Sequence, residues 1–68
     1  MTKEVNLVCV AMRHGEFRST VGYFESVSEV PEGWTLCETD YDITDVMSAN
    51  RCTKQQALTM MNSHWRRV

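Results

Sequence analysis

The spacing of apolar residues changes near Tyr41, and this change limits the possible folds more than any other feature of the sequence. Before Tyr41, apolar and polar residues tend to alternate with the two-residue period of β-strands. After it, apolar residues recur at the three- and four-residue intervals of a helix. Strands that precede helices, rather than alternating with them, are typical of an α+β domain.

Three segments before this point predict strands. The first, 5–12, is apolar on both faces of the pleat, which predicts a central strand. The second, 17–27, is rich in aromatic and β-branched residues and should return antiparallel to the first; Gly22 within it indicates a bulge or a close approach of another backbone segment. A turn at 31–33 leads to the third, 34–41, whose apolar character moves from one face to the other, which predicts a bulge or a departure from the core.

Two helices are expected after the strands. A short helix over 45–50 is capped by Asp42 or Thr44. A longer helix over about 53–66 begins with a capping box at Thr53. Its apolar stripe contains Ala57, Leu58, Met61 and Trp65, with Met60, His64 and Val68 in an adjoining row. The predicted fold is a three-stranded antiparallel sheet followed by one short and one longer C-terminal helix packed on it, in a single domain of residues 1–68.

Composition narrows the functional classes. The chain has 68 residues, 43% of them apolar and 24% charged, and this suits one small globular core. A net charge of −2 argues against a general nucleic-acid binder. The sequence shows neither a membrane-spanning run nor a signal-peptide pattern, so we expect a cytoplasmic protein. Its three cysteines, Cys9, Cys37 and Cys52, are expected to be reduced and mostly buried.

Acidic residues are concentrated after the third strand begins. Four carboxylates lie within eight positions: Glu38, Asp40, Asp42 and Asp45. Strand alternation puts Glu38 and Asp40 on one face about 7 Å apart, too far to share one proton as a catalytic pair. One interpretation is a solvated edge strand whose charges prevent unwanted pairing. The functional interpretation is a patch that docks on a basic partner surface, with Trp34 and Tyr41 as aromatic anchors, although Trp34 would equally suit the core.

Metal sites find little support. A calcium loop starting at Asp40 would place Asp45 where glycine is needed and Arg51 where the final glutamate belongs. The candidate zinc ligands are Cys9, His14, Cys37, Cys52 and His64. Their number suffices for a zinc-stapled structural domain, but their spacing matches no zinc-binding motif. We therefore expect no metal and no cofactor.

The sequence also lacks a catalytic signature. Three glycines form no phosphate-binding loop, and Cys9 lies within a strand, so no enzyme activity is expected. The helix pair superficially resembles a helix-turn-helix, which makes a nucleic-acid-binding regulator the alternative function. The polar residues that would face a groove are Lys54, Gln55, Thr59, Asn62, Ser63 and Arg66. The acidic segment immediately before this pair would repel phosphate.

In size and in its lack of catalytic apparatus, the chain resembles the small proteins encoded by phages, many of which bind and disable or redirect a host protein. We therefore expect a small protein-interaction module that inhibits or modulates a larger partner through its acidic edge and the neighbouring aromatic residues. Neither the partner nor the oligomeric state follows from the sequence.

Overall fold

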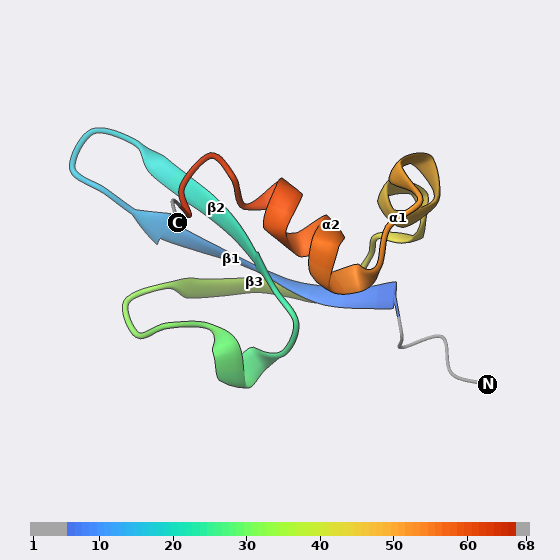
Figure 1. Cartoon of the computed structure of the whole chain (residues 1–68). Coiled ribbons are helices and arrows are strands. Elements are labelled where there is room, and N and C mark those ends of the chain that lie inside the picture. The colour runs from blue at the N-terminus through green and yellow to red at the C-terminus, as the bar shows by residue number, and fades with distance from the viewer. Residues whose placement is uncertain (1–5, 67–68) are drawn as a thin grey trace.

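The computed structural model describes residues 6–66 and has the predicted α+β architecture (Figure 1). Its elements are β1 (Leu7–His14), β2 (Ser19–Phe24), the 3-10 helix η2 (Val27–Glu29), β3 (Thr35–Asp42), α1 (Thr44–Asn50) and α2 (Lys54–Met61). Figure 1 shows α2 lying across the sheet, with α1 at the opposite end of the molecule from the β1–β2 loop.

Strand β1 occupies the centre of the sheet, as its apolar pattern predicts. The strand order is β2-β1-β3, and both pairs are antiparallel. Val8, Cys9 and Ala11 are all buried, so both faces of β1 are covered. The strand runs to His14, two residues beyond the expected end, while Val5 lies outside the described residues.

The two faces of β1 contact different groups of residues. Val8 belongs to a cluster with Ile43, Ala57 and Leu58, which come from α2 and from the residue before α1. Cys9, its neighbour, points to the other face, because successive strand residues alternate. The second cluster consists of Cys9, Ala11 and Phe24, with Val30, Trp34 and Trp65 packed against it. The second face is therefore covered by the β2–β3 connection and the turn after α2, not by a helix.

Strand β3 is irregular, which confirms the predicted bulge. Val8 pairs with Tyr41 and Val10 with Glu38, so three steps along β3 match two steps along β1. A second shift falls between Val10 and Ala11. Each shift inserts one extra residue into β3, and such bulges bend a strand and increase its twist.

The helix boundaries agree only partly with the sequence. Helix α1 ends at Asn50 as expected, and Arg51 follows in the left-handed conformation with a φ of 50°. The capping box is present: Thr53 accepts a hydrogen bond from the Gln56 backbone, while the Gln56 side chain accepts one from the Thr53 N–H. Helix α2, however, ends at Met61 rather than near residue 66.

Two members of the predicted apolar row are also misplaced. Met60 and His64 are exposed, so the buried stripe of α2 is narrower than expected, and Val68 lies outside the described residues. Within residues 6–66, neither helix is long and apolar enough to cross a membrane.

Candidate functional site

The free edge of β2 is closed by a buried side chain. Asn62, with no exposed surface, accepts a hydrogen bond from the Tyr23 N–H at 2.8 Å and donates one to the Tyr23 carbonyl at 2.8 Å. Its Oδ1 also accepts from the Trp65 indole N–H at 3.0 Å. The amide thus satisfies the same donor and acceptor that a neighbouring strand would.

The turn after α2 continues this closure. The His64 Nε2 donates to the Val21 carbonyl at 2.8 Å, two residues along β2 from Tyr23. This turn explains why α2 is short. A helix continued to residue 66 would carry Asn62 and His64 along the helical path instead of laying them along the strand.

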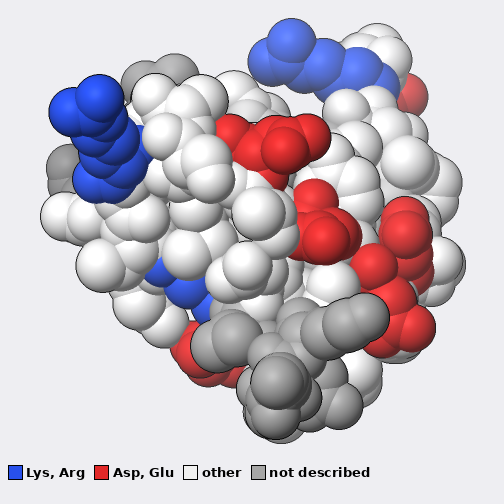
Figure 2. Space-filling view, turned by 90° about the vertical axis from the view of Figure 1, so that its right-hand side faces the viewer, with Lys and Arg blue, Asp and Glu red and all other residues white. Residues whose placement is uncertain are grey.

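The opposite edge, formed by β3, is open. All eight residues of β3 are exposed, and among residues 6–66 no strand pairs with its outer side. We call Thr35–Asp42, together with Asp45 in the first turn of α1, the β3 edge. Figure 2 looks onto the end of the molecule that carries α1. Most of the acidic side chains in this view gather at its centre and right, and the Lys and Arg side chains lie at its left and top.

The acids of β3 do not all project from one face of the sheet. Glu38 lies opposite Val10, and Asp42 lies opposite Leu7. Directly paired residues share a face, and Leu7 and Val10, three positions apart on a regular strand, lie on opposite faces. Glu38 and Asp42 therefore project from opposite faces of the sheet. The bulge between Glu38 and Tyr41 causes this arrangement, because a regular strand would place residues four positions apart on the same face. Negative charge therefore lies on both sides of the edge.

Asp42 has a structural role as well as a charge. Its Oδ1 accepts hydrogen bonds from the Thr44 N–H, at 2.8 Å, and from the Thr44 hydroxyl. These two bonds stabilise the carboxylate and lower the pKa of Asp42. The expectation that Asp42 or Thr44 caps this helix is wrong, because the N-cap is Ile43, which makes no side-chain bond. Asp42 binds the first helical residue, Thr44, from the position before the N-cap.

The two aromatic anchors proposed from the sequence differ in exposure. Trp34 is half-buried, with its ring 5.3 Å from that of Phe24 and 4.8 Å from that of Trp65. It belongs to the second core cluster, which was the alternative interpretation. The ring of Tyr41 lies 5.8 Å from that of Tyr23. Because Tyr41 is still 38% exposed, it can contact a partner beside the acids.

The thiols are all unpaired, but only partly buried. Cys9 is buried, Cys52 is intermediate and Cys37 in β3 is exposed, so the expectation of mostly buried thiols is wrong for Cys37. Burial, with the nearby negative charge of Asp40, raises the pKa of Cys9 and keeps it a neutral thiol. Residues 6–66 contain no group of three His, Cys, Asp or Glu side chains placed to hold a metal ion.

The polar face assigned to a DNA-reading helix is largely engaged elsewhere. Asn62 is buried against β2, and the Gln55 amide donates to Glu25 at 2.6 Å. The hydroxyl of Thr59 donates to the Gln55 carbonyl within the helix. Helix α2 is also only eight residues long.

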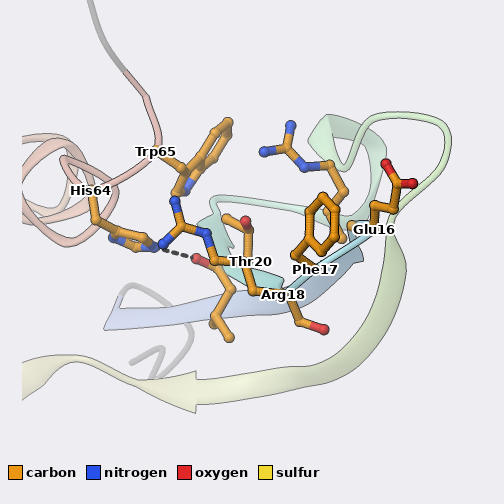
Figure 3. A pocket seen from close by; sticks show the side chains of 10 residues that line it. Glu16, Phe17, Arg18, Thr20, His64 and Trp65 are labelled. Atoms are coloured by element: carbon orange, nitrogen blue, oxygen red, sulfur yellow. Dashed lines mark hydrogen bonds between the residues drawn. The ribbon is translucent and has the colours of Figure 1, made fainter.

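A groove that the sequence did not predict lies at the other end of the molecule. It has a volume of about 740 Å³ and runs between the β1–β2 loop and the turn after α2. Figure 3 shows Phe17 on one side and the rings of His64 and Trp65 on the other, with Thr20 between them. Phe17 is 93% exposed, the most exposed large apolar side chain in the described residues. The signal available in the sequence is an aromatic residue two positions after the loop glycine Gly15, although the pattern of residues 17–27 assigns Phe17 to the strand.

Comparison of the chain with protein-family models, curated proteins and solved structures found no match.

Proposed function

We propose that the chain is a cytoplasmic protein-interaction module that binds a larger protein through the β3 edge. The partner presents an extended segment bearing Lys or Arg, which lies alongside β3 and neutralises its carboxylates. Binding in this way would inhibit or modulate the partner.

The contrast between the two edges carries this proposal. The backbone of β2 is occupied by Asn62 and His64, whereas all eight residues of β3 are exposed. An open strand edge offers backbone hydrogen bonds to an added strand, a recurrent mode of peptide recognition. Because the acids project from both faces, a basic segment that alternates in the same way would meet a carboxylate on either side.

The charges support rapid and selective association more than tight binding. Exposed carboxylates steer an oppositely charged partner, and they contribute less as salt rises. The exposed ring of Tyr41 supplies apolar contact next to them. The same charges and bulges also protect an edge strand from unwanted pairing, so an experiment must distinguish docking from protection.

A defined probe makes the distinction. We suggest titrating the protein with a short peptide of alternating Lys and Val while following backbone amide chemical shifts. Shifts are expected along Thr35–Asp42 and not along Ser19–Phe24, and binding should weaken as salt rises from about 50 to 200 mM. Equal shifts on both outer strands, or none on β3, would contradict the proposal.

Charge variants then identify the natural partner. Neutralising two acids of the edge, with Glu38→Gln and Asp40→Asn, should slow association while leaving the thermal melt unchanged, since surface substitutions alter stability by about 0.5 kcal/mol or less. Glu29→Gln with Glu32→Gln removes the same charge from the exposed β2–β3 connection and serves as the matched control. Proteins captured from a cell extract by the wild type and the control, but lost with the edge variant, are the specific partners.

A further inference from the structure

We propose that the groove between the β1–β2 loop and the turn after α2 binds a nucleotide unit, either free or within a single strand of nucleic acid. This site is distinct from the β3 edge, and its ligand has the opposite charge to the partner proposed there. The groove combines two arginines, an exposed aromatic ring and a polar wall ordered by a hydrogen bond of His64.

The groove is lined by cationic side chains. Arg13 and Arg18 both contribute to its wall, where Glu16 is the single carboxylate. The guanidinium of Arg13 lies 5.2 Å from the centre of the Trp34 ring, and this contact holds the cation in place. Arginine is suited to phosphate because its planar fork donates two parallel hydrogen bonds.

The aromatic ring beside these cations has no packing role. Phe17 is 93% exposed at the end of a loop fixed by the Gly15 N–H, which donates to the Arg18 carbonyl at 2.9 Å. A side chain at Gly15 would place its Cβ 2.7 Å from that carbonyl, so the loop is held tightly. Burying such a ring against a base is favourable, and every base has a flat face that it can cover.

The opposite wall is also ordered. The His64 Nε2 is committed to the Val21 carbonyl, which fixes the imidazole plane and leaves its Nδ1 as the remaining polar atom of the ring (Figure 3). Together with Thr20 it supplies polar groups near the two guanidiniums. A groove of about 740 Å³ falls within the usual range for small-ligand sites and has room for about one or two nucleotides.

Asp42 and Asp45 lie toward the α1 end of the molecule, away from the groove, whereas Glu38 pairs with Val10, three residues along β1 from Arg13. The molecule is 40 Å long, with the β1–β2 loop at one end and α1 at the other (Figure 1). Charges separated by more than about 8–10 Å are largely screened at physiological salt. The net charge of −2 therefore disfavours the binding of a long polyanion that spreads over the whole surface. It does not disfavour the binding of a short anion within the groove. An acidic peptide would satisfy the arginines without using the flat ring of Phe17, so a nucleotide is the better fit.

The test is binding of fluorescein-labelled oligothymidylate of about eight nucleotides, followed by anisotropy at about 50 mM salt. Phe17→Ala should weaken binding about 5- to 150-fold, the usual effect of losing one base–aromatic stack. Arg18→Ala should reduce the slope of log affinity against log salt by about 0.7, the value for one phosphate contact to a single strand. Because both residues are exposed, their melting temperatures should match the wild type.

Matched controls lie elsewhere on the molecule. Met60→Ala removes another exposed apolar side chain, and Arg51→Asn removes a charge at the α1 end while retaining a residue that tolerates the left-handed conformation. Both should bind the oligonucleotide as the wild type does.

Competition with thymidine monophosphate, inorganic phosphate and an oligoglutamate peptide identifies the ligand. Displacement by the monophosphate at a similar concentration indicates a free nucleotide, and much weaker displacement indicates a strand; either result supports the site. The proposal is overturned if the oligonucleotide does not bind, if Phe17→Ala binds as well as the wild type, or if phosphate or oligoglutamate competes as well as the monophosphate.

Discussion

The two outer strands of the sheet have opposite relations to their surroundings. In β2 the outward backbone groups of Tyr23 and Val21 are bonded to Asn62 and His64, and Phe24 is buried. In β3 every residue is exposed. In a sheet this small, two side chains of the turn after α2 can thus satisfy the outward backbone groups of one edge strand. The other edge strand, β3, keeps its outward backbone groups open to solvent. The difference lies in which edge the chain returns to after α2.

The strongest test of this contrast removes the amide that closes β2. Asn62→Ala should lower the free energy of unfolding by about 2–4 kcal/mol, because the Tyr23 N–H and carbonyl lose their partners and each unsatisfied buried group costs about 1–3 kcal/mol. Urea unfolding measures the change. Hydrogen exchange at the Tyr23 amide should accelerate toward the rate of the outward-facing β3 amides.

Ser63→Ala alters the next, exposed residue and should change stability by no more than about 0.5 kcal/mol. If the Asn62 variant unfolds with the wild-type midpoint, the amide does not close the edge.

A smaller effect is expected from crowding the covered strand. The Cβ of Gly22→Ala would lie 2.8 Å from Cζ3 of Trp34 and 3.0 Å from Cε2 of Phe24, so the aromatic cluster must shift. We expect a loss of about 1–2 kcal/mol, the usual cost of overpacking reduced by the gain from replacing a strand glycine. Thermal unfolding with near-ultraviolet circular dichroism reports both the stability and the packing of the rings.

The corresponding change on β3 is Thr39→Ala. Thr39 is exposed, so this change should leave the free energy of unfolding nearly unaltered. Equal destabilisation by Gly22→Ala and Thr39→Ala would show that β2 and β3 are covered to the same extent, and would contradict the difference in burial between the two strands.

The smallest effect concerns the junction between β3 and α1. Hydrogen bonds from Thr44 make the pKa of Asp42 lower in the folded protein than in the unfolded chain. Its contribution to stability is therefore complete above the unfolded pKa and is lost as the pH falls through the lower folded value. Asp42→Asn should be less stable than the wild type at neutral pH, and the difference should disappear in strong acid.

Asp40→Asn carries the same charge change without the bond to Thr44 and is the control. A difference from the wild type that persists unchanged at low pH would mean that the Asp42 carboxylate is not the source. Chemical denaturation across the acid range provides the measurement.

The features that the sequence predicted were those encoded locally. Apolar residues on both faces of 5–12 predicted a central strand, and the exchange of faces between Leu36 and Tyr41 predicted the bulge. The capping box at Thr53 depends on residues only three apart and was also found. In each case the interacting groups lie within one element or its direct neighbour.

The errors arose where a residue acts over a long sequence distance. The sequence pattern assigns Asn62 to the polar face of a helix. Its hydrogen-bond partner, Tyr23, is 39 positions away, so the local pattern does not show the interaction. Gly22 predicted a bulge or a close backbone approach, whereas the group that lies against it is the side-chain ring of Trp34, 12 positions away. Strand alternation also could not show that Phe17 precedes β2 and lies in solvent, so the groove escaped notice.

Asn62 also has a consequence for stoichiometry. A sheet with two open edges can add strands without limit, as a growing polymer does, whereas a sheet with one terminated edge can extend only once. The side-chain amide acts as a chain terminator on β2. Any strand added at β3 therefore yields a finite complex: one bound segment, or two copies joined through their β3 strands, but not a fibre.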